Sequence, residues 1–334
     1  MLRIGNRTGF PAEGALFPDR DGTPVWVVAV KGTFTFAGER LPRAEQPPVI
    51  VADTHRGDPA TSSLLHAAEL GPLRPGTDVV IHGHACAPGG RPTKVVDVAI
   101  RVAGRLSALR VHGQRVWYRS AFGLAISDAA PFVRMPIVYE RAFGGCAVGS
   151  RGARLVDERN PAGVGFHAPD QVPEDAPLPN IEDPAHEIRT IRDRPAPAGT
   201  GYVARHWLPR RALAGTYDAA WHEERRPLLP IDFDERFWLA GPAGLRFEPR
   251  LRGGEPVELL GLTPDGLLSF RLPRVAIGFR SVVNGRVVHH RSMLAAVSID
   301  AGAECVSMVW QSALACAGRF DVQHTEIFEK RVIT

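Results

Sequence analysis

The sequence predicts a mainly β protein of antiparallel sheets, sandwich-like or barrel-like, with a long proline-rich irregular middle segment and a few short helices. Runs of β-branched and aromatic residues partly alternate with polar ones, as half-buried strands do. Short turns that contain Gly or Pro separate these runs, which disfavours a parallel α/β sheet. Nine of the 29 prolines lie between residues 161 and 209, where the apolar spacing has no stable period.

Strands are expected at both ends of the chain. In the first third they are expected at residues 25–36, 77–85, 94–104 and 107–118. Near the C-terminus they are expected at residues 257–262, 267–272, 277–283, 287–290 and 304–314, with a helical middle as the alternative for the last of these. His112-Gly113 fits a tight hairpin turn with positive φ, and Asn284-Gly285 is the best hairpin signal in the chain.

Three regions are expected, packed as one unit. They are an N-terminal antiparallel β region at 1–150, the irregular segment with short helices at 151–240 and a C-terminal antiparallel β region at 241–334. In the middle region, Pro209 and Gly215 fit the start and the end of a short helix. Asp218 is placed to cap a second helix, which Pro227 ends.

Composition indicates a stably folded globular protein. The chain has 334 residues, of which 44% are hydrophobic and 23% charged, so it can bury a large core. No stretch approaches the roughly 18 apolar residues of a membrane helix, and the N-terminus lacks the apolar core of a signal peptide. We therefore expect a cytoplasmic protein without a membrane partner, whose four cysteines are reduced and buried.

Charge gives little support to nucleic-acid binding. The 40 basic residues, only three of which are lysines, are nearly balanced by 36 acidic residues. They are spread along the chain without a basic run, whereas nucleic acid is bound by a concentrated basic face. No nucleic-acid partner is expected.

The stretch RNPAGVGF, residues 159–166, has glycines spaced as in some phosphate-binding loops. It lacks the third glycine of a dinucleotide fingerprint and the Gly-Lys-Ser/Thr ending of a nucleotide-triphosphate loop. A conformational role is favoured, because Pro161 restricts Asn160 to an extended or turn conformation. Gly163 and Gly165 allow backbone angles that are closed to other residues.

Two further motifs carry candidate chemistry. In HGHAC, the residues His82, His84 and Cys86 would share one face of a strand, and imidazole and thiolate are zinc ligands. In IDFD, the carboxylates of Asp232 and Asp234 would share a face, as divalent-metal or acid/base chemistry requires. The plainer interpretation is an open strand face for the first motif and a solvated turn for the second. No nucleophile signature is present.

Several blocks in fixed order resemble the bacterial DUF2169 family, a domain of unknown function. The resemblance covers roughly Trp26 to Trp310. The blocks are SSLLHAAELGPLRPGTDVVIHGHACAPGGRP, MPIVYERAFGG, RNPAGVGF, LPNIEDP, HWLPRRALAGTYDAAW, RPLLPIDFDERF and LRGGEPVELLGL. One departure is GTGYVARHW, where the family has a phenylalanine-glycine-proline run before the tryptophan.

The resemblance implies a non-enzymatic adaptor or chaperone of the type VI secretion system, without cofactors. Such a protein binds a toxic effector and helps to load it onto the spike, which is the valine-glycine-repeat protein or its tip of proline-alanine-alanine-arginine (PAAR) repeats. Two alternatives stay open. One is a metal-dependent hydrolase that uses HGHAC or IDFD, and the other is a secreted effector.

The motif residues are expected to shape loops or to contact a partner, because Trp, Tyr and Arg dominate binding hot spots. In chain order these candidates are Tyr139, Glu140, Arg141, Arg159, Asn160, Gly163, Gly165, Asn180, Glu182, Trp207, Arg210, Tyr217, Asp218, Trp221, Asp232 and Asp234.

Overall fold

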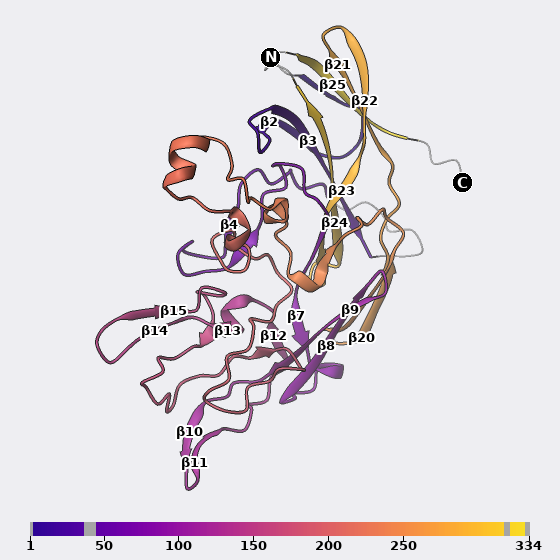
Figure 1. Cartoon of the computed structure of the whole chain (residues 1–334). Coiled ribbons are helices and arrows are strands. Elements are labelled where there is room, and N and C mark those ends of the chain that lie inside the picture. The colour runs from indigo at the N-terminus through magenta and orange to yellow at the C-terminus, as the bar shows by residue number, and fades with distance from the viewer. Residues whose placement is uncertain (1–2, 37–44, 317–320, 331–334) are drawn as a thin grey trace.

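The computed structural model describes residues 3–36, 45–316 and 321–330. Strands dominate, and every helical element is a short turn of 3-10 or π type (Figure 1). The expected mainly β class with antiparallel sheets is confirmed, and the described strands close no barrel. Among these residues, no helix is both long and apolar enough to cross a membrane.

The largest sheet has six strands. In spatial order they are β18 (Arg246–Phe247), β6 (Thr77–His82), β23 (Met293–Asp300), β24 (Cys305–Ala315), β3 (Pro24–Thr35) and β2 (Ala12–Pro18). All neighbours are antiparallel except β6 and β23, which are parallel. β6 is buried along almost its whole length, which fits its continuous apolar run.

Two further sheets complete the β body. The four-stranded sheet runs β1 (Arg3–Asn6), β25 (Val322–Glu329), β21 (Ile277–Val283) and β22 (Arg286–His290). The five-stranded sheet runs β17 (Ile181–Glu182), β9 (Arg105–His112), β8 (Val95–Val102), β19 (Pro256–Thr263) and β20 (Gly266–Arg271). Strands from residues 1–150 and from residues 241–334 are neighbours in all three sheets, so these two regions share their sheets.

Smaller elements decorate this body. The two-stranded pairs are β4 (Thr54–His55) with β5 (Leu64–His66), β7 (His84–Cys86) with β12 (Arg134–Pro136), β10 (Trp117–Ser120) with β11 (Gly123–Ile126), β13 (Phe143–Gly144) with β16 (Val164–Gly165), and β14 (Cys146–Val148) with β15 (Arg154–Val156). The helical turns are η1 (Pro88–Gly90), η2 (Tyr139–Arg141), η3 (Arg211–Ala214), η4 (Trp221–Arg225), η5 (Glu235–Trp238) and η6 (Ala243–Leu245).

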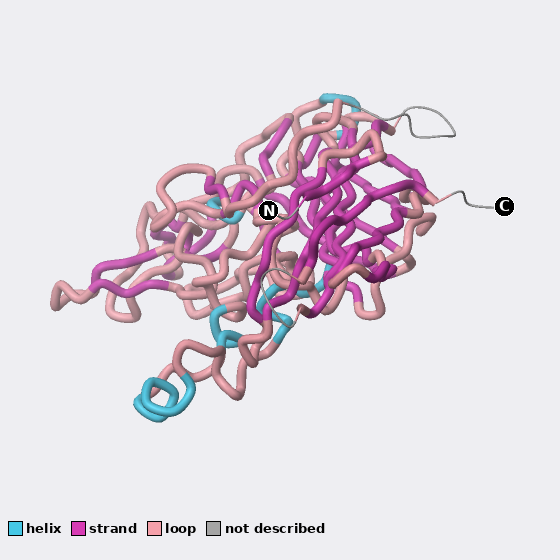
Figure 2. The backbone as a smooth tube through the Cα atoms, turned by 90° about the horizontal axis from the view of Figure 1, so that it is seen from above, coloured by secondary structure: helices cyan, strands magenta, loops and turns pink. Residues whose placement is uncertain are grey.

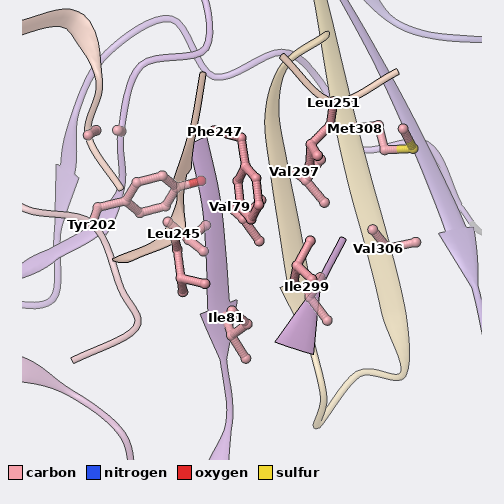
Figure 3. Packing of buried hydrophobic residues seen from close by; sticks show 14 of the residues in the cluster. Val79, Ile81, Tyr202, Leu245, Phe247, Leu251, Val297, Ile299, Val306 and Met308 are labelled. Atoms are coloured by element: carbon pink, nitrogen blue, oxygen red, sulfur yellow. The ribbon is translucent and has the colours of Figure 1, made fainter. Parts of the chain in front are cut away.

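One main apolar core joins the sheets. Figure 3 shows Val79 and Ile81 of β6 packed beside Val297 and Ile299 of β23. Each fully buried side chain of this kind contributes roughly 1.5–3 kcal/mol to the stability of the fold. The indole of Trp26 also donates a hydrogen bond of 2.9 Å to the hydroxyl of Thr325, which links the six-stranded and four-stranded sheets.

Most expected turns and strands are present. Asn284 and Gly285 both have positive φ between β21 and β22, and residues 263–266 turn β19 into β20. The segment expected at residues 304–314 is β24. Residues 151–210 contain only strands of two or three residues within the described part of the chain, as an irregular segment should.

Two strand expectations were wrong. The strand expected at 77–85 breaks at Gly83, so that β6 pairs with β23 while β7 pairs with β12. His112-Gly113 makes no hairpin, because β9 ends there and β10 pairs with β11. A Cβ at Gly113 would lie 1.8 Å from the carbonyl oxygen of Ala130, so close packing requires this glycine.

The cysteines also differ from expectation. All four are free, but only Cys86 and Cys316 are buried, while Cys146 is exposed and Cys305 is half-buried. Cys146 is exposed because it lies on the β14–β15 hairpin, outside the core.

The helical arm, residues 205–238, contains η3, η4 and η5. Figure 2 shows its longest turn standing clear of the strands. Gly215, with φ 80°, follows the last residue of η3 as expected, and a carboxylate oxygen of Asp218 accepts a hydrogen bond of 2.8 Å from the backbone N–H of Trp221. The expected start at Pro209 was wrong, because η3 begins two residues later, at Arg211.

Candidate functional site

A groove of about 920 Å³ lies between the start of the β2–β3 turn, the loop of residues 51–75 and the helical arm. Its walls are largely apolar. They include Phe17, Val51, Leu70, Leu228, Leu229 and Trp238. Val51 is 61% exposed, so the groove is open to solvent on this side.

A second hollow of about 320 Å³ continues the groove. The two share Phe17, Pro72, Leu229 and Trp238 as lining residues. Together they form a channel along the arm that is longer than either hollow alone.

Ion pairs and hydrogen bonds hold the arm against the body. The guanidinium of Arg225 donates to the carbonyl oxygen of Arg20 at 2.9 Å and to a carboxylate oxygen of Asp21 at 2.8 Å. Arg20 in turn donates to the carbonyl oxygen of Ile231 at 2.6 Å. These contacts fix the width of the groove.

The floor of the groove is polar and buried. Arg74, 5% exposed, pairs with Asp78 at 3.0 Å and donates to the carbonyl oxygen of Ala68 at 2.7 Å. The carboxylate of Asp78 also accepts hydrogen bonds from the backbone N–H groups of Ala240 and Gly241. Because both charges are paired and hydrogen-bonded, their burial is tolerated.

A second ion pair lies at the rim, where Arg205 donates to Asp53 at 3.0 Å. Burial favours a higher pKa for Asp53. The hydrogen bond from the N–H of Ala68 and the positive charges of Arg205 and Arg210 outweigh that effect, so the pKa of this carboxyl is lowered. Asp53 is therefore ionised at neutral pH.

Arg210 completes the floor and is only 3% exposed. Its Nε donates to the carbonyl oxygen of Phe237 at 2.8 Å, and its Nη1 donates to that of Val203 at 2.7 Å. Among the described residues, Nη2 has no hydrogen-bond partner and no carboxylate forms an ion pair with this guanidinium. Burial, together with the charges of Arg205 and Arg74, lowers the pKa of Arg210 to about 10, so it remains a cation at neutral pH.

Most of the predicted motif residues lie elsewhere and hold loops together. Asn160 is fully buried, and its amide donates to the carbonyl oxygens of Tyr139 and Phe143. Asn180 accepts a hydrogen bond from the guanidinium of Arg141 and donates to the carbonyl oxygen of His112. Irregular backbone needs such partners when it is buried, because its own groups do not pair in ladders.

Charged motif residues have the same role. Glu140 accepts two hydrogen bonds from Ser63, at 2.8 and 2.9 Å. The buried carboxylate of Glu182 pairs with Arg115 and accepts from the N–H of Ile188. Arg159 pairs with Asp157.

The two glycines of RNPAGVGF differ from each other. Gly165 has φ 93°, as expected for a glycine that permits a left-handed conformation. Gly163 has no such angle, and that expectation was wrong for it. A Cβ there would lie 2.4 Å from the side-chain nitrogen of Asn160 and 2.7 Å from the carbonyl oxygen of Ala142, so tight packing excludes a side chain.

The predicted aromatic residues divide between core and surface. Tyr139 and Trp207 are buried and meet edge to face, with ring centroids 5.6 Å apart. Tyr217 is 53% exposed on the arm, where its ring packs against Trp221. Of these four, only Tyr217 offers a large free surface.

The two candidate metal motifs are arranged as follows. His82 packs against His66 and Tyr202, whereas His84 lies near Arg134, and the thiol of Cys86 contacts the carbonyl oxygen of Leu262. His82 therefore does not share a face with the other two. In the part of the chain that the structure describes, no three His, Cys, Asp or Glu side chains are grouped to hold a metal.

The carboxylates of IDFD hold turns. Asp232 accepts hydrogen bonds from the backbone N–H and the hydroxyl of Thr216, and Asp234 pairs with Arg236. The groove is lined by neither candidate metal motif.

Of the sixteen predicted residues, only Arg210 lines the groove. The sequence analysis did not identify the other residues of its floor, Arg74 and Asp78. Arg74 and Asp78 carry a usable signal, because Asp78 is a charge within an otherwise apolar strand and Arg74 lies four residues before it. Val51, Leu228 and Trp238 carry no comparable signal, since exposed and core apolar residues look alike in a sequence.

One protein-family model matches residues 21–311, and its description reads "uncharacterized protein conserved in bacteria (DUF2169)". No curated protein and no solved structure matches the chain.

Proposed function

This chain belongs to the bacterial DUF2169 family, and from that premise we propose that it is a non-enzymatic adaptor or chaperone of the type VI secretion system. It binds an effector protein in the cytoplasm and helps to load it onto the spike, at the valine-glycine-repeat protein or its PAAR-repeat tip. The motif blocks between Ser62 and Leu262 support this assignment by resemblance.

The observation that carries a binding role is the groove beside the helical arm. Its apolar walls come from segments far apart in the sequence, and its arginine floor is already positioned by backbone carbonyls and carboxylates. Apolar and aromatic side chains next to buried arginine are typical of protein-binding hot spots. Tyr217 and Ile231 are further exposed apolar side chains of the arm, outside the groove lining.

Recovery of partners from the native bacterium tests the proposal. A tagged chain should co-purify with one effector and with a spike protein or its PAAR-repeat tip, identified by mass spectrometry. Deletion of the gene should lower secretion of that effector but not its synthesis, and the wild-type gene should restore secretion.

The control is an unrelated protein with the same tag and similar expression. If neither an effector nor a spike component is recovered above this control, and secretion is unchanged by the deletion, the adaptor proposal is wrong.

A further inference from the structure

The strongest unexplained feature of the molecule is the unpaired charge of Arg210. Buried arginines are nearly always paired with a carboxylate, because an unpaired buried charge is costly. Arg210 is 3% exposed and lines the groove. Among the described residues its guanidinium donates to two backbone carbonyls and lies 5.5 Å from the ring centroid of Phe237, but no carboxylate forms an ion pair with it. The described residues therefore supply no ion-pair partner for this buried cation.

The charged groups around Arg210 also leave it without an ion-pair partner. Its electrostatic neighbours are Arg74 and Arg205 on the positive side and Asp53 and Asp78 on the negative side. Asp78 is engaged by Arg74 and two backbone N–H groups, and Asp53 is engaged by Arg205 and Ala68. Asp19 also lines the groove, but its carboxylate accepts from the backbone N–H groups of Asp21 and Thr23. No carboxylate of the described groove residues therefore forms an ion pair with Arg210.

We propose that the groove binds an extended segment of a partner protein, whose Asp or Glu side chain pairs with Arg210 while its flanking apolar side chains contact the walls. Charge complementarity selects the carboxylate. Phe17, Leu229 and Trp238, which line both hollows, supply a continuous apolar track on which neighbouring residues of the segment lie.

This inference rests on the proposed function in one respect, which is that the occupant belongs to a partner protein. A buried, charge-assisted pair of this kind discriminates strongly between a carboxylate and a neutral amide of the same shape. The groove should therefore prefer Asp to Asn at one position of the bound segment, by at least about tenfold in affinity.

The test uses the purified full chain and two pools of fluorescent heptapeptides. Both pools have Leu, Val, Ala and Ser at the six outer positions, with Asp at the centre of one pool and Asn at the centre of the other. The Asp pool should bind at least about tenfold more tightly in fluorescence polarisation. Equal binding of the two pools, or binding of neither, overturns the proposal.

Variants at Val51 test whether the peptides bind in this groove. They leave the buried arginine floor intact, because this wall residue is 61% exposed. Val51→Glu should weaken binding of the Asp pool relative to Val51→Gln, whereas Val51→Lys should strengthen it. Binding of the Asn pool should change equally little in all three. If the three variants bind the Asp pool alike, the peptide does not lie in this groove and the proposal is wrong.

Arg210→Met removes the proposed partner itself and should abolish the preference for Asp. Because it also frees the carbonyl oxygens of Val203 and Phe237, its fold is checked by circular dichroism, and the Val51 series stands independently of it.

Sodium decanoate is the competing probe. If decanoate binds while neither peptide pool does, the site takes a small amphipathic carboxylate and the peptide proposal fails. These outcomes are separate from the adaptor test. Effector that co-purifies undiminished with Val51→Glu leaves the adaptor role standing without this groove, and peptide binding without recovery of any effector leaves the groove standing without the adaptor role.

Discussion

Arginine side chains in this protein have three different environments, although the sequence presents them alike. Arg115 is buried against the carboxylate of Glu182, Arg210 is buried against backbone carbonyls, and Arg119 pairs with Glu174 in solvent. With 37 arginines in the chain, composition cannot identify a buried arginine without an ion pair, because burial depends on which distant segments fold over a side chain. Arg210 was found by its motif, but its unpaired charge was found only in the structure.

His82 makes stability dependent on pH. Burial, with smaller contributions from His66 and Arg56, lowers the pKa of His82 to about 4, against about 6.5 in an unfolded chain. As the pH falls from about 6.5 to about 4, the imidazole of His82 is therefore protonated in the unfolded state but stays neutral in the folded state. Stability is fully present above that window, and as much as about 3 kcal/mol is lost across it.

Urea unfolding of the wild type and of His82→Leu at pH 7.5, 6.5 and 5.5 measures this contribution. The variant should lose less stability over that range, because its side chain takes up no proton in the unfolded state. It also removes Nε2, which has no hydrogen-bond partner among the described residues. His222→Leu, at an exposed position with no carboxylate partner among the described residues, is the control and should follow the wild type. If the free energy of unfolding falls by the same amount with pH in the wild type and in His82→Leu, the prediction is contradicted.

At the scale of elements, short contacts between loops replace regular ladders in the middle of the chain. β13 and β16 pair over only two residues, and the amide of Asn160 bridges the backbone beside them. RNPAGVGF is thus a packed junction. The packing is tight at Gly163, where a Cβ would lie within 2.8 Å of three neighbouring atoms.

Gly163→Ala should destabilise the protein by roughly 1–3 kcal/mol, because overpacking forces the neighbouring backbone to move. Gly71→Ala is the matched control, since nothing lies within 4 Å of a Cβ built there, and it should change stability by less than about 0.5 kcal/mol. Urea or thermal unfolding of both variants checks this. Similar midpoints for the two would show that the junction is loosely packed.

Sequence signals predicted elements well where adjacent residues determine the backbone conformation. Asn284-Gly285, TPDG and the cap at Asp218 depend on a few adjacent residues and were found from the sequence. His112-Gly113 and the break at Gly83 were misjudged, because contacts with Ala130 and with two different partner strands decide them. A glycine needed for close approach looks the same in sequence as one needed for a turn.

At the scale of the molecule, the two ends of the chain build the same sheets. The parallel pairs β6–β23 and β1–β25 join residues from opposite ends of the sequence. No local sequence pattern predicts these pairings. The sequence therefore predicted the class and most strands, but neither the strand order nor the groove, which needs three distant segments in place.

Fragments should show this dependence. Residues 1–150 alone lack β23, β24 and β25, so their apolar strands have no partners, and we expect poorly dispersed amide signals in a proton–nitrogen correlation spectrum. Residues 241–334 alone should behave likewise.

The control is the whole chain cut after folding, at a protease site inserted near Gly152 in the exposed turn between β14 and β15. Its two pieces should stay together and keep dispersed signals, because the shared sheets hold them. A well-dispersed spectrum from residues 1–150 alone would contradict the prediction.

The position of β25 between β1 and β21 also has a consequence for synthesis in the cell. β1 is among the first segments to leave the ribosome, but its partner strand is made only after nearly all the other strands. β3 can pair with β2 early, but its other edge lacks its partner β24, and β6 lacks its partner β23, until late in synthesis. We therefore expect general chaperones to bind the nascent chain before its sheets are complete.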